Sequence, residues 1–271
     1  MSEQQEPRSL YQPLAGTGVL VTRPAHQADA LCALIESAGG RAVRFPTLVI
    51  SAAPDAGAAR AALAACTHYD WILFVSANAV DQAMALRPAA DWPAGLRCAA
   101  LGMGTVRALI RHGLTAQLVA PPPHDSEALL AMPPLQALSG QRLLIIRGVG
   151  GRELLGETLR ARGAQVDYAE VYQRTRPDSD TRDILAAWAR GAIDIMTVTS
   201  AEALRNLVAM LGESGREQLL RTPLVVVSGR MVQQALTLGF TSPRLAEAAG
   251  DAALLAALIA WRCATTVGES E

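Results

Sequence analysis

LLIIRGVGGRELLGETLRARGAQVDYAEVYQR, residues 143–174, carries the pattern of one strand, a turn, a helix and a second strand. Residues 143–146 form a short apolar run, typical of a strand buried on both faces, and a glycine-rich turn follows at 148–151. Leucines then recur at helical spacing until Gly163, which stands where a helix C-terminal glycine is expected. The stretch predicts a βαβ unit with arginine and glycine gathered in its turn.

Short apolar strands and helices alternate along the rest of the chain, which predicts parallel sheets of the doubly wound α/β kind. The pattern also repeats itself. Three pairs of equivalent residues each lie 124 positions apart: Arg23 and Arg147, Asp70 and Asp194, and Ser76 and Ser200. We interpret this as an internal duplication that gives two similar α/β domains.

Duplication leaves two arrangements open, either two domains in series or two domains that exchange segments. The extended segments 43–50 and 166–173 follow the first strand–helix–strand of each half and could be crossings. In the exchanged arrangement, residues 17–45 join 178–271 in one domain and 50–170 form the other. Residues 46–49 and 171–177 would then be linker strands. The residue pattern favours the exchange only slightly.

Composition excludes several classes of function. All 24 basic residues are arginine, so lysine chemistry such as Schiff bases or a Walker A site is excluded. The net charge of −1 provides no basic field for nucleic acid. The four cysteines and four histidines are scattered, which argues against a structural metal site. With no apolar signal core and no run of about 18 apolar residues, we expect a cytoplasmic protein without a membrane segment.

The turns after the predicted strands are the candidate binding sites, because ligands of parallel sheets bind beyond the carboxyl ends of the strands. These turns carry hydroxyls, glycines and arginines without an acid–base pair, which suits a polyanion better than a metal. An alternative interpretation is that the serines are ordinary helix N-caps and that Arg147 and Arg152 are ordinary surface charges. The candidate substrate-binding residues are Thr22, Arg23, Ser76, Ala77, Asn78, Gly102, Thr105, Arg147, Gly148, Gly150, Arg152, Thr199, Ser200, Ser228, Gly229 and Arg230.

Several of these motifs together resemble one known family. They are LIIRGVGGRELL at 144–155, RGAQV at 162–166, VYQR at 171–174, VLVTRP at 19–24, SANAV at 76–80 and DSEALL at 125–130. In this order and spacing they resemble uroporphyrinogen-III synthases, over residues from about 18 to 258. The resemblance implies two flavodoxin-like domains with exchanged segments joined by a two-stranded linker, which resolves the choice of arrangement.

The resemblance also implies an activity. Hydroxymethylbilane, a linear tetrapyrrole with eight carboxylates, would lose its hydroxyl as water and close through a spiro intermediate. Its last ring, D, is inverted in the process, and the type III isomer feeds heme biosynthesis. No cofactor is implied, and we expect a monomer whose partner is this small molecule. The alternative is a non-enzymatic, hinged two-domain binding protein for a polyanionic small molecule.

By resemblance, Tyr172 is the candidate catalytic residue, which would help the hydroxyl to depart either as a weak general acid or through an ordered water. Thr105 matches a family hydroxyl near the cleft. The sequence departs from the family pattern at Val75, where a threonine is frequent, and at Met231 and Val232, where some members have hydroxyls. Arg230 is the candidate to bind the carboxylate in place of those hydroxyls.

Overall fold

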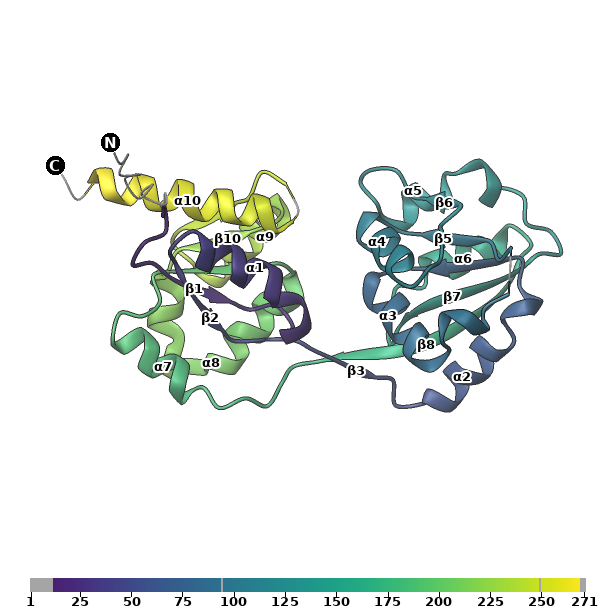
Figure 1. Cartoon of the computed structure of the whole chain (residues 1–271), viewed down its shortest axis with the longest axis horizontal. Coiled ribbons are helices and arrows are strands. Elements are labelled where there is room, and N and C mark those ends of the chain that lie inside the picture. Colours follow the sequence, from purple (N-terminus) through teal and green to yellow (C-terminus); the bar gives the residue numbers. More distant parts are fainter. Residues whose placement is uncertain (1–11, 94, 249, 269–271) are drawn as a thin grey trace, which may run out of the picture. The chain divides into compact units, whose positions relative to one another are not determined.

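The computed structural model describes residues 12–93, 95–248 and 250–268, which fold as two compact units (Figure 1). The first unit contains the described residues up to Val49 together with those from Arg176 onward, and the second contains Ile50–Thr175. The chain therefore enters the second unit once and leaves it once. The sequence prediction placed these crossings at residues 46–49 and 171–177.

The first unit is built on a five-stranded sheet whose described pairings are all parallel. Its central strands are apolar because both faces are covered by helices; all four residues of Gly18–Val21 are buried. In sheet order the strands are β11 (Pro243–Leu245), β10 (Leu224–Val226), β9 (Ile195–Val198), β1 (Gly18–Val21) and β2 (Arg41–Arg44).

Helices cover both faces of this sheet. One face packs against α1 (Ala25–Ser37) and α10 (Asp251–Gly268), which lie side by side (Figure 1). The other packs against α7 (Arg182–Ala189), α8 (Ala201–Arg221) and α9 (Gly229–Leu238). In α1 the buried residues Ala28, Leu31, Cys32 and Ile35 recur at the spacing of one helix face.

The second unit has a six-stranded sheet, again with helices on both faces. In sheet order the strands are β3 (Val49–Ala52), β8 (Gln165–Thr175), β7 (Arg142–Gly148), β4 (Trp71–Phe74), β5 (Cys98–Ala100) and β6 (Leu118–Val119). One face carries α2 (Ala56–Ala64), α3 (Ala77–Leu86) and α4 (Met103–Arg111), and the other α5 (Ser126–Leu130) and α6 (Leu154–Ala161). Single 3₁₀ turns lie at Cys66–His68, Ala89–Asp91 and Pro133–Leu135.

The two sheets have the same strand order when the duplication is taken into account. If β7 is matched with β1 and β8 with β2, both sheets follow the flavodoxin-like order 2-1-3-4-5, with β3 added beside β8. In the second unit the first βαβ element comes last in the chain. This confirms the predicted fold class of two doubly wound, flavodoxin-like domains with exchanged segments, linked through the neighbouring strands β3 and β8.

The duplication extends to backbone contacts made by Asp194 and Asp70. Asp194 Oδ2 accepts a hydrogen bond from the Gly18 backbone N–H (2.7 Å), and Asp70 Oδ2 accepts one from the Arg142 N–H (2.8 Å). Each aspartate also donates its own N–H to the carbonyl of the same partner residue. The repeated aspartates therefore fix the register of β9 against β1 in the first sheet and of β4 against β7 in the second.

Within the described ranges, no helix combines the length and the apolar composition that crossing a membrane requires.

Candidate functional site at the carboxyl ends of the strands

In the second unit, the predicted residues gather at the carboxyl edge of four adjacent strands. Tyr172 lies near the end of β8, Arg147 and Gly148 end β7, Ser76 follows β4 and Gly102 follows β5. Because parallel neighbours end at the same side of a sheet, residues far apart in the chain meet here. The helices α3 and α4 begin at this edge and direct their first N–H groups toward it.

A pair of hydroxyl groups forms the centre of this edge. The hydroxyl oxygens of Ser76 and Tyr172 lie 3.1 Å apart, within hydrogen-bond distance. Ser76 Oγ also accepts the Ala79 N–H (3.0 Å), so this serine is the N-cap of α3 as well. The capping hydrogen bond fixes the position of the Ser76 oxygen, which in turn positions the Tyr172 hydroxyl. Tyr172 is buried, with 3% of its surface exposed.

A register shift in β8 turns Tyr172 toward Ser76. Along this strand Val166 and Tyr168 pack on one face and Ala169 and Val171 on the other, in the usual alternation. Arg147 pairs with Glu170, but the next residue of β7, Gly148, pairs with Tyr172. The extra residue places Tyr172 on the same face as Val171, next to α3. Without it, alternation would direct the phenol to the opposite face.

Gly148 provides the space for the Tyr172 ring. A Cβ at this position would lie 2.7 Å from Tyr172 Cζ and 2.8 Å from Cε2, well inside contact distance. We expect Gly148→Ala to displace the ring from Ser76 and to lower the free energy of unfolding by about 1–3 kcal/mol, the usual cost of overpacking. Thermal unfolding and a crystal structure of the variant would measure both effects.

A second substitution separates this clash from other effects at Gly148. Leucine at position 172 lacks the ring atoms Cζ, Cε2 and OH, so Gly148→Ala should cost much less stability in a Tyr172→Leu background. Equal costs in the two backgrounds would mean that the glycine is needed for another reason.

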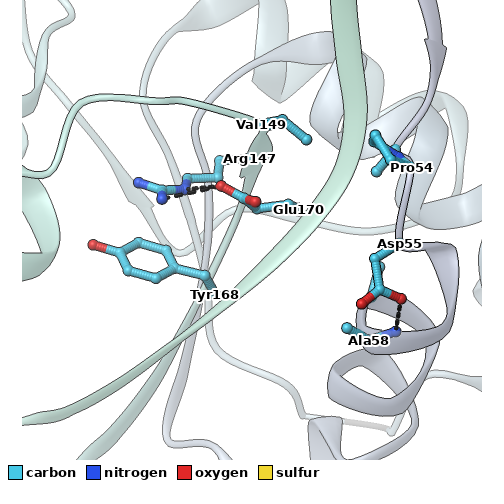
Figure 2. Close-up of a pocket in the computed structure, with 9 residues that line it drawn as sticks. Pro54, Asp55, Ala58, Arg147, Val149, Tyr168 and Glu170 are labelled. Carbon is cyan, nitrogen blue, oxygen red and sulfur yellow. Dashed lines mark hydrogen bonds and ion pairs between the residues drawn. The ribbon is translucent and has the colours of Figure 1, made fainter.

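Two cavities flank Arg147. One, of about 250 Å³, has an apolar wall that includes Val75, Leu101 and Leu155, with Ser126, Arg152 and Arg174 among its polar residues. The other, of about 440 Å³, lies beside the N-terminus of α2, and Figure 2 shows Arg147, Tyr168 and Glu170 at its wall. Arg152 is exposed, so its charge is presented to solvent.

The predicted anion-binding arginines at 147 and 23 are already paired with carboxylates. Arg147 is 8% exposed and its Nη2 lies 2.7 Å from Glu153 Oε1 and 3.0 Å from Glu170 Oε1. In the first unit, Arg23 Nη1 is paired with the carboxylate of Asp251 at the start of α10. The sequence analysis did not predict these carboxylate partners. For Glu170 there was one signal, because it follows Val166 and Tyr168 at the strand period of two and so belongs to the same face of the strand.

The remaining predicted residues of the first unit also lie at one carboxyl edge, after β1, β9 and β10. Ser200 Oγ accepts the Ala203 N–H (3.0 Å) and Ser228 Oγ accepts the Met231 N–H (3.4 Å), so both are N-caps. They are half-buried, like Thr199, whereas Gly229 and Arg230 are exposed.

Two predicted threonines are buried. Thr22 is 0% exposed and donates its hydroxyl to the Thr197 carbonyl (2.8 Å), which ties β1 to β9. Thr105 is 4% exposed in the first turn of α4. In the second unit Ala77 and Asn78 are half-buried in the first turn of α3, and Gly150 is exposed.

His124 is a residue of this edge that the sequence prediction missed. It adopts φ 63°, a left-handed conformation rare for a residue with a side chain, and its ring lies against Gly102. Its Nδ1 lies 2.7 Å from the Ala120 carbonyl, which can only accept, so this nitrogen carries the hydrogen. Only the three prolines before it, at 121–123, marked this loop in the sequence.

Among the residues that the structure describes, no three of histidine, cysteine, aspartate or glutamate come together as a possible metal site. The edge of each unit offers hydroxyls, helix N-termini and arginines instead. The fold defines a class of protein: a duplicated, segment-exchanged flavodoxin-like protein with two α/β units.

Comparisons with known proteins identify the family. A family model described as "Uroporphyrinogen-III synthase HemD" matches residues 29–256. The chain is 37% identical over 250 residues to the uroporphyrinogen-III synthase of Salmonella typhimurium, covering 89% of this chain and 99% of that protein. For the Escherichia coli uroporphyrinogen-III synthase the identity is 36% over 245 residues, with the same coverage. The chain belongs to the uroporphyrinogen-III synthase family.

Solved structures agree in fold. A mutant uroporphyrinogen III synthase of Thermus thermophilus matches with a TM-score of 0.59 at 22% identity, over 92% of this chain and 99% of that one. The uroporphyrinogen-III synthetase of Helicobacter pylori matches with a TM-score of 0.54 at 13% identity, over 89% and 98%. At these identities the likeness concerns the fold alone.

Proposed function

We propose that this chain is a uroporphyrinogen-III synthase, a cyclising lyase that acts on hydroxymethylbilane. The hydroxymethyl group leaves as water to give an azafulvene, and the terminal pyrrole ring attacks it through its substituted carbon to give a spiro intermediate. Fragmentation and reclosure then yield the type III isomer with ring D inverted. Family membership supports the activity, because the relatives that match over nearly the whole chain carry this name.

The observation that carries the proposal at the level of the site is the hydroxyl pair of Ser76 and Tyr172, 3.1 Å apart at the carboxyl edge. Departure of a hydroxyl as water requires a hydrogen-bond donor or acid at the leaving oxygen. The Tyr172 phenol can serve as that donor, and Ser76 orients it. A separate acid–base pair is not needed, because the rest of the task is to hold the bilane in a folded conformation.

The eight carboxylates of the substrate require anion contacts. We propose that these come from the helix N-termini and hydroxyls at the edges, from Thr199, Ser200 and Ser228, and from the exposed Arg152 and Arg230. Backbone N–H groups at fixed positions stabilise carboxylates without a paired catalytic residue. Arg230 would supply the carboxylate contact that Met231 and Val232 cannot make.

The test is to incubate the purified chain with freshly generated hydroxymethylbilane and to separate the uroporphyrin isomers after oxidation. The bilane closes by itself to the type I isomer, so a type III product above the protein-free control would demonstrate the synthase. Type I alone would turn the proposal toward a non-enzymatic binding protein.

We also propose a cytoplasmic monomer. The thiols of Cys32, Cys66 and Cys98 are buried and unpaired, and Cys263 is exposed and unpaired, which fits a reducing compartment. Light scattering of the purified protein would give the mass of the assembly, to be compared with 28.5 kDa for one chain.

A further inference from the structure

Arg147 is surrounded by acceptor groups from its own unit. Its Nη2 contacts Glu153 (2.7 Å) and Glu170 (3.0 Å), and its Nε donates to Glu170 (3.2 Å). Two carboxylates therefore face the Arg147 guanidinium, and its own positive charge is already paired within the unit. An additional substrate carboxylate would have to displace one of them, so Arg147 is poorly suited to direct anion binding.

The same guanidinium supports the turn between β7 and α6. Its Nη1 lies within hydrogen-bond distance of the carbonyl oxygens of Gly151 (3.4 Å) and Arg152 (3.5 Å). Its stem packs beneath the turn, since a Cβ on Gly151 would lie 3.1 Å from Arg147 Cδ. These contacts connect the end of β7 to the residue that presents its charge to solvent, Arg152.

The Tyr168 ring also packs against the Arg147 guanidinium. The Arg147 guanidinium carbon lies 3.7 Å from the centre of the Tyr168 ring, and the Tyr168 hydroxyl donates to Glu153 (2.9 Å). The Arg147 guanidinium, with the Tyr168 hydroxyl, lowers the pKa of Glu153, which therefore stays ionised. Burial raises the pKa of Tyr168, and its hydrogen bond to Glu153 raises it further. The phenol therefore stays protonated and can donate that hydrogen bond. A Cβ on Gly156 would lie 1.9 Å from the Tyr168 oxygen, so a larger residue there would displace the Tyr168 ring.

The turn that Arg147 supports is also connected to the hydroxyl pair. The Val149 N–H donates to the Tyr172 carbonyl (2.8 Å), and Gly148 lies against the Tyr172 ring. A change in the turn would therefore move both Arg152 and Tyr172.

We propose that Arg147 is a positioning residue for the synthase reaction. It fixes the turn at 148–152. In this position the Arg152 guanidinium can contact a substrate carboxylate, and the Tyr172 hydroxyl keeps its hydrogen bond to Ser76. The assignment rests on the proposed function and replaces the expectation that Arg147 itself binds a substrate carboxylate. It predicts that fork geometry at position 147 matters more than charge, because lysine cannot contact both carboxylates and two carbonyls at once.

The experiment compares Arg147→Lys and Arg152→Lys in isomer-resolved steady-state kinetics. We expect Arg147→Lys to lower kcat about tenfold or more, because Tyr172 loses its position. Arg152→Lys should act mainly on KM, raised a few-fold, and should lower kcat much less than Arg147→Lys does, because a point charge still attracts a carboxylate. Arg147→Lys with normal kcat and only a raised KM would overturn the assignment, since that is the behaviour of a charge contact.

A readout that needs no activity keeps this test separate from the proposed function. Amide hydrogen exchange of the peptide covering 148–155 should be at least about tenfold faster in Arg147→Lys, with peptides of the first unit unchanged. Arg160→Lys is the matched control: Arg160 stacks on the same Tyr168 ring (5.1 Å) but donates to the Val166 carbonyl instead of the turn. Unchanged exchange at 148–155 in Arg147→Lys would overturn the positioning role, whatever product the wild type makes.

A double variant tests the link through Glu153. If Arg147 acts by holding the turn against Glu153, adding Glu153→Gln to Arg147→Met should cost little further activity, because the two residues act as one unit. Fully additive effects of the two substitutions would contradict the proposal.

Discussion

Replacement of Tyr172 by phenylalanine is expected to lower kcat about 100-fold, the lower end of the usual contribution of a general acid. The ring would remain in place beside Gly148, but the hydroxyl that lies 3.1 Å from Ser76 Oγ would be absent. KM should change little, because the carboxylates of the bilane are held elsewhere. Initial rates of type III formation, separated from spontaneous type I closure, are the measurement. Full turnover by Tyr172→Phe would show that conformational control of the bilane alone is sufficient.

Ser76→Ala is the companion variant, and it changes two contacts at once. It removes the hydrogen bond to Tyr172 and the N-cap of α3, which should cost about 1 kcal/mol of stability. Ser200→Ala removes an equivalent cap on α8, so its free energy of unfolding gives the reference for the stability cost of losing such a cap. If Ser76 acts by orienting the phenol, its removal should have little further effect on kcat in the Tyr172→Phe background.

Gly18→Ala is expected to destabilise the first unit strongly. The new Cβ would lie 2.0 Å from the backbone oxygen of Ala192, and backbone cannot rotate away as a side chain can. Gly18 also donates its N–H to Asp194, so a shift of β1 would break this bond. We expect a loss of about 3 kcal/mol in the free energy of unfolding. That corresponds to a fall of roughly 6–12 °C in the unfolding temperature of the first unit.

Gly104→Ala provides the control for this prediction. A Cβ there meets no atom within 4 Å, and alanine has the higher helix propensity, so its stability should be equal to or above that of the wild type. A Gly18→Ala protein as stable as Gly104→Ala would mean that β1 can move away from the Ala192 loop at little cost.

Much of the architecture followed from local sequence pattern. The apolar runs before 147 and 23, and the aspartates at 70 and 194, predicted a duplicated parallel α/β fold, and the structure confirms it. Strand periodicity and glycine turns are local properties, and therefore visible in one sequence. The candidate residues could also be grouped, because strand ends of parallel neighbours share one edge.

The pairing of individual side chains could not be predicted in this way. Arg23 meets a carboxylate 228 positions away at Asp251, and no local pattern indicates such a partner. The register shift at Gly148 places the Tyr172 side chain on the opposite face of the sheet from the one expected, because the sequence of β8 suggests unbroken alternation. Both features arise from tertiary packing, which selects among side-chain directions that the sequence alone leaves equivalent.

The exchange of segments has a consequence for the order of events on the ribosome. Strand β1 must pair with β9, and Val19 is aligned with Ile195, so its partner is translated 176 residues later. At the usual rate of about 5–20 residues per second, synthesis of the chain between these two strands takes roughly 9–35 seconds. All the strands of the second sheet, by contrast, lie within one continuous stretch of chain. The second unit can thus fold during synthesis, while β1 has only β2 beside it and lacks its other neighbour, β9, until residues 195–198 have been made.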